Sequence, residues 1–143
     1  MSHSLQNCKI TPYYRNLLDS LGPEHPLRRT IEPLDDCAPA PGELADPLGE
    51  ETHSPVPGLV HTYPDKVLLF ATLDCAAYCR YCTRGRLVGS RDWKLSADVF
   101  RYLETHTEIR DVLVSGGDPL TLSDEELDEL LSSVRTVKHI RTI

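Results

Sequence analysis

Apolar residues form two unbroken runs in the second half of the chain. The first covers 66–73 (Lys-Val-Leu-Leu-Phe-Ala-Thr-Leu) and the second covers 111–115 (Asp-Val-Leu-Val-Ser). Both have the length of a strand, and apolar runs without polar alternation are typical of parallel strands buried on both faces. We therefore predict two parallel strands there, and the start of a third at 140–143.

Elsewhere the apolar residues fall on one face of a helix. The first such stretch follows Thr11 and Pro12, which suit the N-cap and the first helical position, and the Gly-Pro pair at 22–23 ends it. A second helix is predicted to begin at Ser96. A third begins at Ser123, where Ser-x-x-Glu predicts a capping box and the following leucines keep helical spacing.

This order of elements predicts the fold class. Strand, helix, strand, helix, strand indicates right-handed βαβ units and an α/β fold with a parallel sheet. The preceding residues 23–58 are rich in proline and acid, and we interpret them as an extended arm lying over the larger body. We therefore divide the chain into an N-terminal helix and proline-rich arm at 1–62 and βα units at 63–143.

Composition narrows the class of protein. Lys plus Arg number 15 against 22 for Asp plus Glu, and this net charge of −7 argues against a nucleic-acid partner. No apolar stretch approaches the ~20 residues of a membrane span, and no leader pattern is present, so we expect no membrane partner and a cytoplasmic location. Cys8 and Cys37 stand alone, and we interpret both as structural or incidental.

The other three cysteines, Cys75, Cys79 and Cys82, follow the first predicted strand at x3 and x2 spacing. Thiolates hold iron–sulfur clusters, and three close cysteines without a fourth leave one iron open to a ligand. A zinc site needs a fourth ligand, and the nearest histidine, His61, lies before the strand. A disulfide suits a reducing compartment poorly, and inert buried cysteines would not explain the regular spacing. We predict cluster ligands, with a non-catalytic iron–sulfur or zinc binding module as an alternative.

The second predicted strand ends in a glycine-rich turn. Its residues are Gly116, Gly117, Asp118 and Pro119. Glycine permits positive φ and a close approach of a ligand to the backbone. Because ligands bind beyond the carboxyl ends of parallel strands, we expect this turn and the cysteine loop at one rim of the sheet.

The spacing Cys-x3-Cys-x2-Cys, with Tyr81 before the last cysteine, resembles the cluster loop of the radical S-adenosylmethionine enzymes. In that superfamily the open iron chelates S-adenosylmethionine. One electron, which comes from an external donor through the cluster, then gives a 5′-deoxyadenosyl radical. The segments 46–48, 54–65, 82–84 and 115–120 resemble, more specifically, the lysine 2,3-aminomutase family. Its members use this radical with pyridoxal 5′-phosphate to move an amino group between two carbons of an amino acid.

The resemblance implies a role for several residues. The [4Fe–4S] cluster ligands would be Cys75, Cys79 and Cys82. Tyr81 would lie against the adenine of S-adenosylmethionine, and the turn at 116–118 would meet its amino end. Arg84 would pair with the substrate α-carboxylate, a task that suits a planar, two-pronged donor.

The resemblance also places Tyr63 at the pyridoxal phosphate site. Here the chain departs from the family pattern, because Thr62 and Lys66 stand where arginines are expected. Lys66 can serve a phosphate as a point charge, whereas Thr62 offers only a hydroxyl. The family's Schiff-base lysine and its substrate-selecting acidic residues fall in a part that this chain does not have.

The residues and the resemblance together predict the start of a partial (β/α) barrel of the radical S-adenosylmethionine type, preceded by a helical and extended arm. We expect an aminomutase-like isomerase with an amino acid substrate, and we expect this chain to be a fragment that is inactive alone. A radical S-adenosylmethionine enzyme without pyridoxal phosphate is the first alternative. The identity of the amino acid and the formation of a homo-oligomer are left open.

Overall fold

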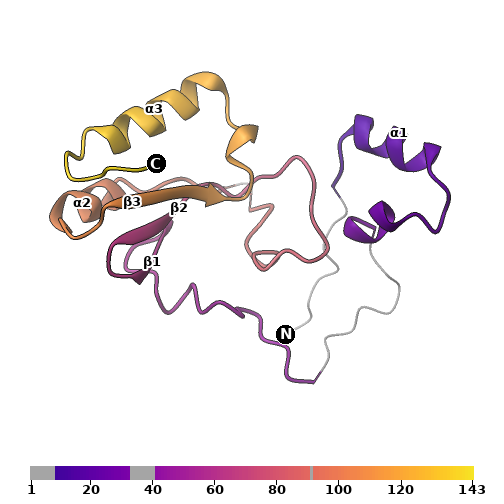
Figure 1. Ribbon diagram of the computed structural model, residues 1–143, viewed down its shortest axis with the longest axis horizontal. Helices are drawn as coiled ribbons and strands as arrows, with labels where there is room; N and C mark the ends of the chain where they lie inside the picture. Colours follow the sequence, from indigo (N-terminus) through magenta and orange to yellow (C-terminus); the bar gives the residue numbers. More distant parts are fainter. Residues whose placement is uncertain (1–8, 33–40, 91) are drawn as a thin grey trace.

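The computed structural model describes residues 9–32, 41–90 and 92–143, so Cys8 and Cys37 lie outside the described residues. In chain order the elements are α1 (Pro12–Ser20), the 3-10 helix η1 (Pro26–Thr30), β1 (Leu59–Tyr63), β2 (Lys66–Thr72), α2 (Asp98–Thr105), β3 (Asp111–Gly116), the 3-10 helix η2 (Pro119–Thr121) and α3 (Asp124–Arg135). Figure 1 shows α3 along one face of the sheet, and α1 and η1 at the far end of the molecule. The predicted α/β class is confirmed.

The sheet has three strands in the order β1-β2-β3. β2 and β3 are parallel, with Lys66 opposite Asp111 and Phe70 opposite Ser115, as the apolar runs predict. β1 pairs with β2 in the antiparallel sense across a two-residue turn, and the sequence pattern does not predict it. The boundary that we expect between 62 and 63 falls inside β1, and the division into two parts stays a prediction.

The start of a third strand, predicted at 140–143, is present only as a single parallel pairing. These residues are all described, and they form no strand. Instead, Thr142 makes one isolated parallel bridge to Asp111 on the free edge of β3, where Val112 N donates to Thr142 O at 2.9 Å. The amides of Arg141 and Thr142 both donate to Arg110 O, and with the bond from Val112 they make this one parallel bridge, beyond which no strand is formed.

Apolar side chains cover both faces of the sheet. One cluster joins the strands to α2 and α3 and includes Leu59, Val67, Leu69, Val99, Leu103, Val112, Leu130 and Val134. The cluster on the opposite face contains Val60, Phe70 and Leu73, packed against Leu68, Leu87 and Trp93. Successive residues of β2 thus point to opposite clusters, which explains why its sequence shows no polar alternation.

The helix starts follow local capping chemistry. Thr11 Oγ1 accepts from Tyr14 N at 3.2 Å, which confirms the predicted N-cap of α1. The capping box that opens α3 at Ser123 is also confirmed. α2 begins at Asp98, later than the predicted Ser96. Among the described residues, no helix is long and apolar enough to cross a membrane.

Candidate functional site

The cysteine loop and the glycine-rich turn lie side by side at the carboxyl ends of β2 and β3. Gly117 N donates to Thr72 O at 2.6 Å, and Asp118 N donates to Asp74 O at 2.7 Å. A Cβ on Gly117 would stand 2.1 Å from Asp74 O. Gly116 has a φ of 108°, and a Cβ there would stand 2.3 Å from Thr72 O. Only glycine lets the turn close onto the start of the cysteine loop, and the predicted shared rim is confirmed.

The three candidate ligands, Cys75, Cys79 and Cys82, carry free, half-buried thiols. Burial raises the pKa of Cys75, and the negative charges of Cys82 and Asp118 add to the effect. The thiols and the turn are therefore within electrostatic reach of one another. Within the described residues, no three Cys, His, Asp or Glu side chains have the arrangement of a formed metal site.

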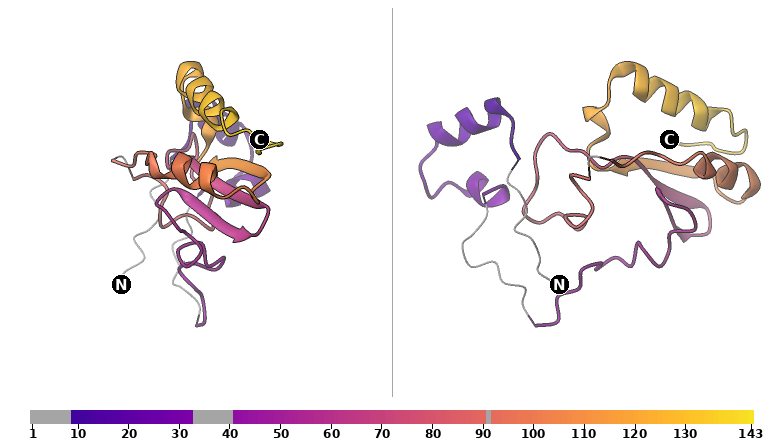
Figure 2. Two further views of the ribbon diagram at one scale, coloured as in Figure 1. Left: turned by 90° about the vertical axis from the view of Figure 1, so that its left-hand side faces the viewer. Right: turned by 180° about the vertical axis from the view of Figure 1, so that it is seen from behind.

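The N-terminal segment holds the cysteine loop from outside the sheet. Tyr78 N donates to Lys9 O, and Arg80 N donates to Thr30 O, each at 2.8 Å. The ammonium of Lys9 also pairs with the carboxylate of Asp74, and this hydrogen bond raises the pKa of Lys9. In Figures 1 and 2 the loop accordingly lies between the sheet and the pair formed by α1 and η1. The residue Lys9 before α1 and the end of η1 are thus attached to the loop through backbone hydrogen bonds.

Arg84 lies within the site but is already paired with Glu50. Its Nε is 3.0 Å and 3.1 Å from the two carboxylate oxygens of Glu50, and its Nη2 is 2.6 Å from Oε1. On its other side, Nη1 is 3.4 Å from Ser115 Oγ. The guanidinium carbon lies 5.2 Å from the centre of the Phe70 ring. Both side chains are largely buried, since Arg84 is 16% exposed and Glu50 is 7% exposed.

Sequence reasoning missed Glu50 because it lies in the acid-rich arm, where exposure is the ordinary expectation. Glu50 is nevertheless the only buried polar or charged residue in the described part of the chain. A signal was present: two adjacent acids at 50–51 match two arginines at 84 and 86, so the charges of arm and loop are complementary.

The neighbouring residues complete an acidic clamp, which we define as Asp46, Glu50 and Glu51. Arg86 Nε is 2.9 Å from Glu51 Oε1, and Arg86 Nη2 is 3.0 Å from Asp46 Oδ1. The second contact is an ion pair without the alignment of a hydrogen bond. The amide of Glu51 is the main cause of the lowered pKa of Asp46, and Arg86 contributes less. The clamp therefore fixes the end of the arm against the cysteine loop.

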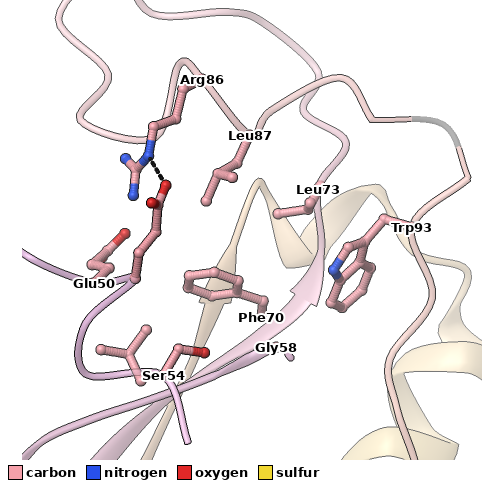
Figure 3. A pocket seen from close by; sticks show the side chains of 10 residues that line it. Glu50, Ser54, Gly58, Phe70, Leu73, Arg86, Leu87 and Trp93 are labelled. Carbon is pink, nitrogen blue, oxygen red and sulfur yellow. Dashed lines mark hydrogen bonds and ion pairs between the residues drawn. The ribbon is translucent and has the colours of Figure 1, made fainter. Parts of the chain in front are cut away.

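A cavity of about 180 Å³ lies beside the clamp on the sheet face away from α2 and α3. Figure 3 shows Phe70, Leu73, Leu87 and Trp93 around its apolar part, and Glu50 and Arg86 at its polar edge. A second cavity, of about 400 Å³, lies next to the cysteine loop and is lined by Lys9, Asp74 and Tyr78 among others. Both cavities therefore adjoin the elements that carry the candidate chemistry.

Two predicted site residues lie apart from these contacts. Tyr63 ends β1 and is 62% exposed, and Lys66 Nζ lies 5.9 Å from the centre of its ring. Both residues are at the opposite end of β2 from Cys75, about 20 Å away at the usual rise of a strand. Tyr81 belongs to the cysteine loop but is 72% exposed. The structure thus brings Arg84 close to the cysteine loop and the glycine-rich turn, whereas Tyr63 lies apart from them.

Comparisons with known proteins bear on this arrangement. L-lysine 2,3-aminomutase from Clostridium subterminale is 42% identical over 139 residues, which are 94% of this chain and 33% of that protein. The resemblance to the lysine 2,3-aminomutase family is confirmed. The lysine 2,3-aminomutase of Bacillus subtilis is likewise 42% identical, over 94% of this chain and 30% of that protein. Glutamate 2,3-aminomutase from Clostridioides difficile is 36% identical over 92% of this chain and 32% of that protein.

The resemblance covers one part of those aminomutases. The chain spans about a third of the length of the curated relatives it matches, which is consistent with their N-terminal part. No family model matches the chain. The names of the relatives support an isomerase family of the aminomutase kind.

Proposed function

We propose that this chain is the cluster-binding part of an amino acid 2,3-aminomutase of the radical S-adenosylmethionine type, and that its sheet begins a partial (β/α) barrel. The observation that supports this most is the close contact between the three-cysteine loop and the glycine-rich turn at one rim of parallel strands. The aminomutase names of the relatives support the reaction class. We propose this reaction for the whole protein.

The residue types and the spacing of the cysteine loop suit an iron–sulfur cluster. Cys75, Cys79 and Cys82 offer three free thiols on one loop, and thiolate is the ligand that such clusters take. When bound, a [4Fe–4S] cluster supplies a single electron to S-adenosylmethionine. The chain's own part is to hold the thiols, to present the backbone of the Gly116–Gly117 turn beside them, and to keep the rim closed through the bond from Asp118 N to Asp74 O.

Arg84 supplies the contact for an amino acid carboxylate. Its guanidinium reaches across the sheet face to Ser115 at the carboxyl end of β3, next to the glycine-rich turn. A guanidinium whose plane is fixed can donate two parallel hydrogen bonds to a carboxylate. The relatives are named for lysine and for glutamate, so this contact concerns the part that all α-amino acids share, and the substrate side chain is left open.

We propose pyridoxal 5′-phosphate as a second cofactor because of the resemblance to the family. Tyr63 offers an exposed ring and Lys66 a nearby cation, which suit an aromatic phosphate. A radical S-adenosylmethionine enzyme without this cofactor remains the second candidate, because both residues lie a strand's length from Cys75. Equilibrium dialysis with pyridoxal 5′-phosphate distinguishes the two: binding that Tyr63→Ala removes supports the aminomutase.

Anaerobic reconstitution tests the cluster. We expect about four irons and four sulfides per chain, as for a cubane, and we expect Cys79→Ala to abolish their incorporation. Cys8→Ala and Cys37→Ala are matched controls that should retain it. A cluster that survives Cys79→Ala would refute the assignment, and about one zinc per chain would indicate the non-catalytic binding module.

A further inference from the structure

The buried carboxylate of Glu50 calls for an explanation beyond stability. Withdrawing a carboxylate from water is unfavourable unless it is paired, and even a well-paired buried ion pair often stabilises a protein no more than apolar side chains would. Glu50 is 7% exposed, and both of its oxygens contact Arg84. This pairing therefore indicates a role in fixing the geometry of Arg84.

The contacts of Arg84 leave one edge of its guanidinium for a ligand. The group has five N–H donors. Glu50 takes the one on Nε and one on Nη2, and Ser115 takes one on Nη1. The contacts of the described residues leave two donors, one on each Nη, and these form an end-on fork for a carboxylate if Ser115 takes the Nη1 hydrogen that faces away from Nη2.

The backbone that carries Glu50 is held on both sides. Asp46 Oδ2 accepts from the backbone amide of Glu51 at 2.8 Å. The side-chain carboxylates of Asp46 and Glu51 both pair with Arg86. The Phe70 ring lies against the guanidinium of Arg84 and restricts its plane further. Displacement of Glu50 by a ligand would leave a buried carboxylate without its partner, so the geometry favours a carboxylate that orients Arg84 and stays in place.

We propose that Glu50 is the positioning residue for Arg84: it holds the Nε and Nη2 side of the guanidinium, so that the Nη1 and Nη2 edge is presented to the carboxylate of the amino acid. This inference rests on the proposed function, because it takes Arg84 as the carboxylate contact. Glu50 itself does not touch the ligand. The negative charge and the length of the Glu50 side chain are both required, because its carboxylate must accept two N–H groups at once.

Two substitutions separate charge from reach. Glu50→Gln keeps the shape and removes the charge, whereas Glu50→Asp keeps the charge and shortens the side chain. Glu129→Gln is the matched control, because it makes the same charge change at an exposed side chain of α3, on the other face of the sheet from the acidic clamp. Circular dichroism identifies variants that fold, and Glu50→Asp carries the test if Glu50→Gln does not fold.

The first measurement is the exchange rate of the Arg84 Nε–H in the metal-free chain, followed by nitrogen-15 NMR. The second is the affinity for glycine, which has the shared carboxylate and no side chain, measured by calorimetry after loading with cluster and S-adenosylmethionine. We expect both Glu50 variants to speed the exchange and weaken glycine binding by about tenfold or more, the effect of one charge-assisted hydrogen bond. Glu129→Gln should change neither.

Several results would overturn the inference. Unchanged Nε–H exchange in both Glu50 variants would show that Glu50 does not orient Arg84. Tighter glycine binding in Glu50→Gln would make Glu50 a competitor for Arg84, and loss of fold in both variants would assign it a structural role. If the unsubstituted chain binds no glycine, or if Arg84→Lys binds it equally well, the proposed carboxylate contact fails, and the Nε–H exchange rates alone then decide whether Glu50 positions Arg84.

Discussion

Replacing Gly117 by alanine should open the rim that joins the two candidate loops. The new Cβ would stand 2.1 Å from the carbonyl oxygen of Asp74 and 2.8 Å from its carbonyl carbon. Both atoms belong to the backbone, so no flexible side chain can move aside. Ordinary van der Waals contact begins at 3.4 Å, so the turn must retreat by more than an ångström.

The size of the effect follows from the contacts that this movement breaks. The retreat stretches the hydrogen bonds from Gly117 N to Thr72 O and from Asp118 N to Asp74 O, each worth about 0.5–1.5 kcal/mol. Overpacking adds about 1–3 kcal/mol. A total of about 2–6 kcal/mol is a large share of the roughly 5–15 kcal/mol that stabilises a typical domain.

Urea unfolding of the metal-free chain measures this loss, and iron content after reconstitution measures its consequence for the loop. Because Asp74 precedes Cys75, we expect Gly117→Ala to lower both the unfolding midpoint and the iron content. Gly22→Ala is the matched control, since a Cβ there meets nothing within 4 Å, and its stability should stay within about 0.5 kcal/mol of the parent. A Gly117→Ala chain as stable as the control would refute the close contact at the rim.

Two further predictions concern α3 and the edge of the sheet. Ser123→Ala should lower the free energy of unfolding by about 1 kcal/mol in urea titrations, because the hydroxyl that accepts from Glu126 N is lost. Asp111→Asn should remove part of the pH dependence of stability. The hydrogen bond from Arg110 lowers the pKa of Asp111 below its ordinary 3.8, so its contribution is present above pH 3.8 and is lost as the pH falls below that value. Unfolding curves of the parent and Asp111→Asn should therefore converge in acid, and a constant difference would contradict this.

The parallel pair and the shared rim could be predicted because the signals are local. The runs at 66–73 and 111–115 lack polar alternation, and each leads directly into its special loop. Once two parallel strands are placed, their carboxyl ends must meet at one edge. The capping residues Thr11 and Ser123 are equally local, since each cap involves an amide three residues away. Such features need no knowledge of the tertiary structure.

β1 could not be predicted from its own residues, because the pattern of burial changes within its five residues. Leu59 and Val60 are buried, but Thr62 and Tyr63 are exposed, and proline-rich sequence precedes them. The strand forms because its backbone pairs with β2 across the turn at 64–65, an interaction that depends on the neighbour and not on the segment itself. The pair Pro64-Asp65 is a turn signal, but the proline-rich sequence before Leu59 gives no sign of a strand that would pair with β2.

Glu50 was missed for a related reason, because its burial depends on a residue that is distant in the sequence. The shape of the cysteine loop depends on distant residues in the same way. The residues between β2 and α2 form neither helix nor strand in the described part of the chain, so their positions depend on groups outside the loop. The N-terminal segment supplies carbonyl oxygens at Lys9 and Thr30, the glycine-rich turn closes on Asp74, and the acidic clamp holds Arg84 and Arg86. Each of these contacts joins residues far apart in the sequence. A motif search can find the three cysteines, but the groups that hold them in place become visible only once the chain is folded, because burial of Glu50 requires an arginine 34 positions away.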